Sequence, residues 1–138
     1  MTFHENISIA TKGYCDVVDI TDHVAGAVQK SKISNGIVVV FVVGSTAAIT
    51  TLEANANLEK DLNEALEIIA PKNKSYYHDE KWGDGNGFSH IRASLIGPSL
   101  AIPIVHGELT LGTWQQIVLC DFDNRSRKRE IVIHVLGD

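Results

Sequence analysis

The sequence has only two cysteines, Cys15 and Cys120, and no long apolar run. A disulfide scaffold needs more cysteines and a zinc ribbon needs Cys-x-x-Cys pairs, so both classes of protein are excluded. The longest apolar run extends from Ile37 to Val43, whereas a membrane-spanning helix needs about 20 apolar residues. Residues 1–6 carry no apolar segment of the kind found in signal peptides. We therefore expect reduced thiols, no membrane partner and a cytoplasmic location.

Basic residues are also scarce relative to acidic ones. Lysine and arginine total 12 and aspartate and glutamate total 17, which gives a formal net charge of −5. Proteins that bind nucleic acid through its phosphates are usually basic, so we expect no nucleic-acid partner. A length of 138 residues fits one domain spanning 1–138.

Hydrophobic patterning predicts strands and helices in an irregular order. Extended segments are expected at 3–11, 14–20, 37–43, 46–53, 100–105, 116–122 and 130–136. Helices are expected after an N-cap at Thr21, over 58–69 after a cap at Asn57, and briefly after Asn86 or Ser89. The 37–43 strand is apolar on both faces and should be central, and a turn at Asp123-Asn124 predicts a hairpin. This order favours an α+β fold, with a layered mixed or antiparallel sheet and two to three helices.

The segment 72–87 has no hydrophobic period and is predicted to be a long polar loop. Loops of this length in a small domain are often functional. His78 lies in the loop and His90 lies just beyond it, and neutral imidazole is a common zinc ligand. Their spacing fits a metal site but also fits solvated histidines. Asp79, Glu80 and Asp84 offer carboxylates for Mg²⁺ or for orienting a histidine, and they also fit a simple solvated surface.

Four further residues are candidates for chemistry outside this loop. Glu53 ends an otherwise apolar strand, as either a surface residue or a site carboxylate. Trp114 and Gln115 begin a strand after a glycine-rich segment and either pack or line a pocket. Arg127 belongs to a basic cluster at 125–129, which is either a solvated turn or a phosphate clamp.

Two stretches carry a family resemblance. They are Ser99-Leu-Ala-Ile-Pro-Ile-Val-His-Gly107 and, four residues later, Gly112-Thr-Trp-Gln-Gln-Ile117. Further matches are Ser45-Thr-Ala-Ala-Ile-Thr-Thr-Leu-Glu53, Tyr77-His78, and Asn86 followed by Ser89-His90-Ile91. With these motifs the chain resembles the YjbQ family, also described as secondary thiamine-phosphate synthases, over nearly its whole length.

The resemblance implies a homotrimer with a site near the subunit interfaces and a histidine-rich metal centre that includes His78 and His90. Many members have a histidine where this chain has Gly44, so a ligand or catalytic group is missing there. We hypothesise that His106 completes the centre, with zinc as the expected metal and Mg²⁺ as the alternative.

Three functions follow from these observations. The first is a transferase like a thiamine-phosphate synthase, which joins a pyrimidine pyrophosphate to a thiazole phosphate and releases pyrophosphate. Glu53, Trp114, Gln115 and Arg127 are its candidate catalytic residues. The second is a zinc-dependent hydrolase or lyase that uses metal-bound water. The third is a trimeric protein that binds a small phosphorylated metabolite without catalysis.

Overall fold

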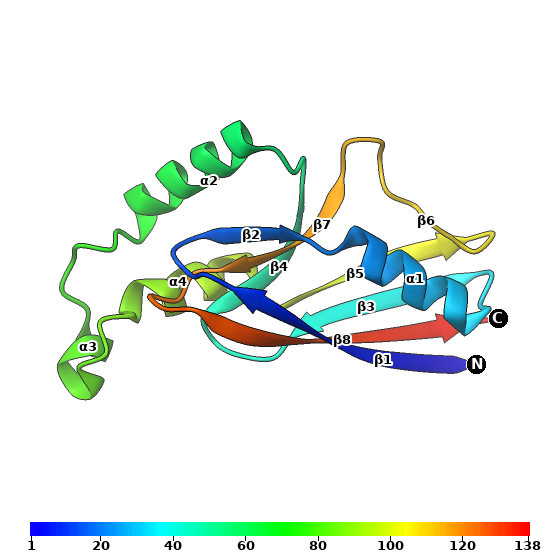
Figure 1. The fold of residues 1–138 in the computed structure, drawn as a ribbon, viewed down its shortest axis with the longest axis horizontal. Helices are drawn as coiled ribbons and strands as arrows, with labels where there is room; N and C mark the ends of the chain where they lie inside the picture. Colours follow the sequence, from blue (N-terminus) through cyan, green and yellow to red (C-terminus); the bar gives the residue numbers. More distant parts are fainter.

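Two antiparallel sheets form the frame of the protein in a computed structural model that describes all residues, 1–138. The five-stranded sheet has the order β1 (Thr2–Thr11), β8 (Arg127–Gly137), β3 (Gly36–Val42), β5 (Ser99–Val105) and β6 (Glu108–Leu109). The three-stranded sheet has the order β2 (Asp16–Asp19), β7 (Gln116–Asp121) and β4 (Ala47–Leu52). The helices are α1 (Thr21–Ser31), α2 (Ala56–Ile69), α3 (Tyr77–Trp82) and α4 (Gly87–Ile96) (Figure 1). The predicted α+β class is confirmed.

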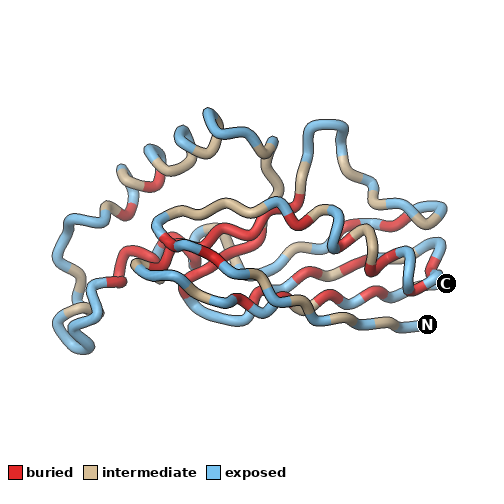
Figure 2. The backbone as a smooth tube through the Cα atoms, viewed as in Figure 1, coloured by how far each residue is buried: buried red, intermediate tan, exposed pale blue.

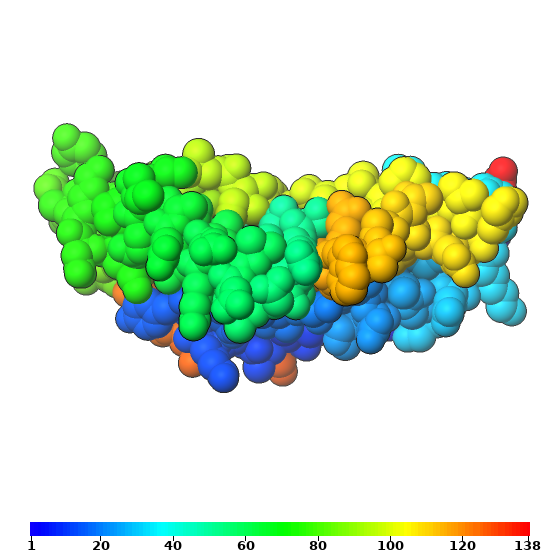
Figure 3. Space-filling view, turned by 90° about the horizontal axis from the view of Figure 1, so that it is seen from above, coloured from blue at the N-terminus to red at the C-terminus, as the bar shows by residue number.

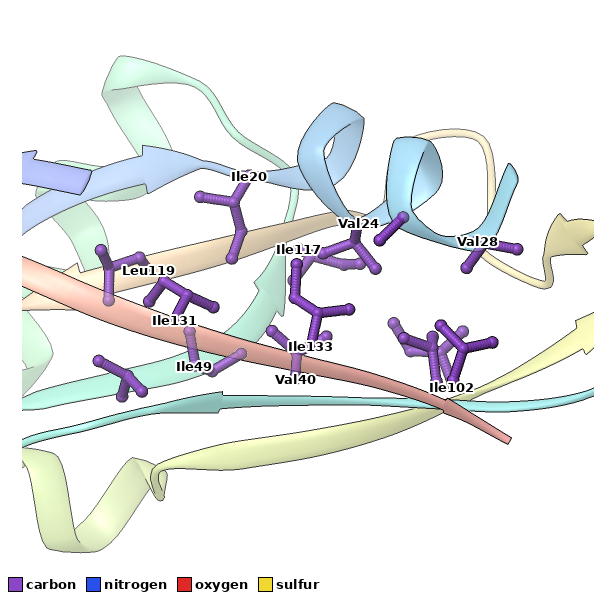
Figure 4. Packing of buried hydrophobic residues seen from close by; sticks show 14 of the residues in the cluster. Ile20, Val24, Val28, Val40, Ile49, Ile102, Ile117, Leu119, Ile131 and Ile133 are labelled. Carbon is purple, nitrogen blue, oxygen red and sulfur yellow. The ribbon is translucent and has the colours of Figure 1, made fainter. Parts of the chain in front are cut away.

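The core lies in two apolar layers, one on each face of the three-stranded sheet. In the first layer, β3 and β8 pack against α1 and against the inner side chains of β4 and β7. Val24 and Val28 of α1 face the side chains of the strands there (Figure 4). In the second layer, Val118 and Cys120 of β7 pack with Leu66 of α2 and Ala93 of α4. Buried residues are accordingly concentrated in the strands, while α3 has none (Figure 2).

Local sequence explains most of the helix boundaries. The Asn55 side chain accepts a 2.9 Å hydrogen bond from the Leu58 backbone N–H, so Asn55 caps α2, which begins two residues earlier than predicted from an Asn57 cap. The predicted end of α2 at Ile69 is confirmed, just before Pro71. Thr21 is the first residue of α1 rather than its cap, and its hydroxyl accepts from the Ile117 N–H.

Three further predictions about the fold were wrong, namely the final hairpin, the loop over 72–87 and the number of helices. The last long strands do not form a hairpin, because β7 pairs with β2 and β4 whereas β8 pairs with β1 and β3. The turn after Asp121 therefore carries the chain from one sheet to the other. The 72–87 segment is not entirely loop, since it contains α3, and the helices number four. The central position predicted for β3 is confirmed, between β8 and β5.

The molecule is elongated (Figure 1). Figure 3 shows α2 and the segment that follows it, in green, at one end, and the region of β5 and β6, in yellow, at the other. The longest helix, α2, has 14 residues. No helix is both long and apolar enough to span a membrane.

Candidate functional site

A polar cavity of about 400 Å³ opens where α3 and α4 meet the start of β8. Its lining is Gly44, Ser45, Thr46, His78, Trp82, Asp84, Asn86, His90, Arg127 and Arg129. Trp82 is the single apolar side chain among them. The cavity thus joins the predicted histidines to the predicted arginine cluster, although these segments are far apart in sequence.

The cap of α3 and a hydrogen bond between α3 and α4 position the two histidines. His78 lies on α3, which ends at Gly83 in the left-handed conformation that glycine adopts without strain. The Asp79 carboxylate accepts a 2.9 Å hydrogen bond from the Gly87 N–H, the first residue of α4. A carboxylate here satisfies an otherwise free helix N–H and suits the helix dipole. Asp79 therefore ties α3 to α4, which carries His90.

The histidine rings lie side by side, with their centroids 4.4 Å apart and their planes tilted by 42°. His78 Nδ1 lies 3.3 Å from Asp79 Oδ1 and 3.4 Å from Asp84 Oδ1. Burial, with a smaller effect from His78, lowers the pKa of His90. The lowered pKa keeps this imidazole neutral, which is the form that binds a metal.

Behind the arginines, the Asp123 carboxylate is fully buried and accepts four hydrogen bonds. The donors are Thr46 Oγ1 at 3.0 Å, Asn86 Nδ2 at 3.1 Å, the Asn124 N–H at 2.8 Å and Arg127 Nε at 2.7 Å. Burial alone would raise the pKa of Asp123, but these hydrogen bonds outweigh it and lower the pKa to about 2. Asp123 is therefore a permanent anion that fixes one edge of Arg127.

Asp121 holds Arg129 in the same manner. Its two oxygens lie 2.7 Å from Arg129 Nε and 2.9 Å from Nη2. The third guanidinium nitrogen, Nη1, points toward Gly44, where an added Cβ would lie only 2.7 Å from it. Gly44 also has φ +132°, a conformation that residues with a side chain rarely adopt. The Arg129 guanidinium thus lies where a side chain at position 44 would be.

The structure does not bring all the predicted site residues together within one chain. His106 forms the turn between β5 and β6, where its N–H donates to Asn35, at the opposite end of the molecule from α3 (Figure 1). His106 therefore does not complete a centre with His78 and His90 in the same chain. The reason is topological, because β5 runs away from α4 and ends at the far side of the sheet.

Three of the four predicted catalytic residues share a second cavity of about 430 Å³. Glu53, Trp114 and Gln115 line it, and Arg127 lies in the first cavity instead. Gln115 Nε2 donates to Thr51 Oγ1 at 3.1 Å, and the Gln115 side-chain oxygen accepts from the Gly112 N–H. Gln115 thereby shapes the loop that presents Trp114, whose exposed fraction is 72%.

Sequence reasoning missed the two carboxylates that hold the arginines. Asp121 and Asp123 flank Phe122 at the end of an apolar strand, and both are fully buried. Buried carboxylates need cationic or hydrogen-bonding partners. The sequence pattern that could have predicted these ion pairs is two aspartates at the end of an apolar strand, followed by arginines a few residues later.

An antiparallel α+β protein with a cavity lined by histidine, aspartate and arginine is the class that fold and site define together. A family model for UPF0047 proteins, described as YjbQ-like, matches residues 5–138. This chain belongs to that family.

Individual relatives agree with this assignment. A UPF0047 protein of Methanocaldococcus jannaschii is 39% identical over 124 residues, which cover 89% of this chain and 86% of the relative. A crystal structure from Sulfolobus solfataricus, titled a YbjQ-like protein of unknown function, has a TM-score of 0.94 at 33% identity, covering 100% of this chain and 99% of that one. An uncharacterised family member from Clostridium acetobutylicum has a TM-score of 0.87 at 38% identity, covering 96% and 99%.

Proposed function

We propose that the cavity beside α3 and α4 is a divalent-metal site of an enzyme that acts on a small phosphorylated metabolite. The observation that carries the proposal is the grouping of His78, Asp79 and Asp84, whose candidate ligand atoms all lie within 4.8 Å of one another. The His90 imidazole lies next to this group. Imidazole and carboxylate donors suit zinc, and the oxygen donors also suit Mg²⁺.

A buried oxygen atom without a hydrogen-bond donor further supports a bound cation in this cavity. Asn86 Oδ1 is buried and has no hydrogen-bond partner, although its amide nitrogen donates to Asp123. Such an atom normally finds a donor or a cation, because an unsatisfied buried acceptor costs about 1–3 kcal/mol. Asn86 lines the same cavity as His78 and Asp84. A cation held by the histidine and carboxylates would supply positive charge close to a bound substrate.

Arg127 and His90 are the residues of the cavity that would act on a bound substrate and on the cation beside it. Arg127 presents N–H donors to the cavity, and Asp123 fixes its orientation by accepting from Nε. Donors held rigidly before substrate arrives stabilise developing negative charge without reorganising. His90, whose pKa is lowered by burial, offers a neutral imidazole nitrogen to the same cation. These roles fit a reaction that releases an anionic leaving group.

The transferase suggested by the family resemblance is such a reaction. The thiazole nitrogen of the phosphate substrate forms a bond to the pyrimidine's methylene carbon, and the bond from that carbon to pyrophosphate breaks. The departing pyrophosphate carries the negative charge that Arg127 would stabilise. A zinc-dependent hydrolase or lyase is the second candidate, favoured by the histidine pair.

Self-association as a homotrimer is part of the proposal. The outer face of the five-stranded sheet carries Ile37, Val39, Phe41, Val132 and Leu136, and several of these are exposed. A shallow hollow lined by Val39, Phe41, Val132, His134 and Leu136 lies on this face. Contiguous exposed apolar surface of this kind is typical of protein interfaces.

A direct test measures pyrophosphate release from the pyrimidine and thiazole substrates. We expect activity in the metal-loaded protein, loss on chelation, and loss in His78→Ala. His106→Ala is the matched control and should keep the wild-type rate if the active site lies within one chain's cavity. If metal-loaded protein releases no pyrophosphate while hydrolytic or lyase substrates turn over, the second candidate replaces the first. Unchanged activity after full metal removal would contradict both.

A further inference from the structure

The arginine side of the cavity carries more donors than the protein itself uses. Arg127 commits only Nε to Asp123, and Arg129 commits Nε and Nη2 to Asp121 and Thr46. Both Nη atoms of Arg127 and the Nη1 atom of Arg129 have no partner in the protein. The Arg129 side chain is 8% exposed and that of Arg127 is 33% exposed. These free donors border the cavity rather than open surface.

The neighbouring backbone lies close to these donors. Gly44 has no side chain, so the Arg129 guanidinium fits against the backbone there, 2.7 Å from where a Cβ would lie. Ser45 lies next to Gly44 on the cavity lining, and its hydroxyl makes no hydrogen bond within the protein. The two guanidinium groups and this hydroxyl therefore border the same side of the cavity.

From this arrangement we infer that Arg127, Arg129 and Ser45 form an oxyanion subsite on this side of the cavity, which binds the phosphoryl group of the ligand. Guanidinium groups bind phosphate oxygens through paired N–H donors, and arginines held by carboxylates lose little freedom on binding. Asp121 and Asp123 are both saturated by donors, so their lone pairs are not directed at the ligand. The inference rests on the proposed function, because it places the phosphoryl end of the same ligand.

Acidic side chains near the histidines set the conditions for binding. Asp84 lines the cavity, Asp79 lies beside His78, and both would repel an anion when no cation is bound. A divalent cation bound by these groups would remove this repulsion. Phosphate and metal should therefore each raise the other's affinity by the same factor, as linkage requires. A ligand whose phosphoryl group lies against Arg127 and Arg129 would extend its reacting part toward the histidines, which line the same cavity.

The test titrates inorganic phosphate and pyrophosphate into the protein by calorimetry, in chelator and again with zinc or Mg²⁺. We expect pyrophosphate to bind wild type, and Arg127→Gln to weaken binding by about tenfold or more, since charge-assisted hydrogen bonds are lost. Arg127→Lys keeps the positive charge but removes the paired N–H donors of the guanidinium, so it should cause an intermediate loss of affinity. Arg125→Gln is the matched control, because it removes the same charge from the same turn but does not line the cavity.

The outcomes separate this inference from the metal proposal. Anion binding that is lost in Arg127→Gln but unaffected by metal supports the subsite and counts against the metal site. Equal weakening in Arg127→Gln and Arg125→Gln would show only general charge attraction and would overturn the subsite. Absence of pyrophosphate binding in both metal states, in a protein that does bind zinc, would also overturn it.

Discussion

The Asp121 carboxylate and the Arg129 guanidinium form a two-pronged ion pair that links the two sheets. Asp121 ends β7 in the three-stranded sheet, and Arg129 lies on β8 in the five-stranded sheet. Thr46, just before β4, accepts a further hydrogen bond from Arg129 Nη2 at 2.6 Å. The same pair that joins the sheets therefore also positions Arg129 at the cavity, so stability and site geometry depend on the same atoms.

Breaking this pair should be costly. Asp121→Ala leaves a buried guanidinium without its counter-charge, which typically destabilises a protein by about 3–5 kcal/mol. Urea denaturation at neutral pH measures the loss. Asp61→Ala removes an exposed carboxylate from α2 and should change stability by no more than about 0.5 kcal/mol. Similar effects of the two substitutions would contradict the structural role given to Asp121.

Asp123 should make stability depend on pH in the acid range. Its pKa is about 2 in the folded protein, below the ordinary value of 3.8. The charged form is favoured by folding, so this contribution is fully present above about pH 4 and disappears as pH falls toward 2. The shift corresponds to about 2 kcal/mol.

The measurement is the urea midpoint of wild type and Asp123→Asn across this range. The difference between the two proteins should shrink as the solution is acidified from pH 5 to pH 2. A difference that stays constant with pH would show that the charge of Asp123 is not what stabilises the fold.

If copies associate through the outer face of the five-stranded sheet, a charge introduced on that face should disrupt the oligomer, whereas a charge elsewhere should not. Phe41→Asp places a carboxylate in the apolar hollow on that face and should convert an oligomer into monomers, because burying an unpaired charge is unfavourable. Ile68→Asp is the control, since Ile68 is 84% exposed on α2, away from this face. Light scattering coupled to gel filtration gives the masses. A wild-type protein that is monomeric at micromolar concentration would contradict the homotrimer.

Local patterns in the sequence were sufficient for most of the elements. The apolar run at β3 predicted a central strand, and that position is confirmed. The predicted stripe of α2 is only partly buried, because Leu66 is its single buried residue and Ile69 is 61% exposed. The helix α3 was missed because all of its six residues are exposed or half-buried, so it has no apolar stripe to detect. Its fold depends on Asp79 bonding to α4, which is a contact between side chain and backbone.

Pairing between distant strands is what the sequence could not reveal. Adjacent strands usually pair, and that rule predicted a hairpin between β7 and β8. The strand partners of β7 and β8 depend on which apolar side chains pack together in the folded protein. The Asp121–Arg129 ion pair forms because β7 and β8 lie in different sheets. The turn from β7 to β8 also places Arg127 in the same cavity as His78, whereas His106 lies at the far end of β5.

The most direct consequence of a metal centre that includes His78 and His90 is bound metal. The protein is purified without a histidine tag, loaded with zinc, dialysed and measured by elemental mass spectrometry. We expect close to stoichiometric zinc in wild type and in the His106→Ala control, and marked loss in His78→Ala and His90→Ala. Wild-type protein that retains no zinc, Mg²⁺ or other divalent metal after loading would contradict this metal centre, as would full retention in both cavity variants.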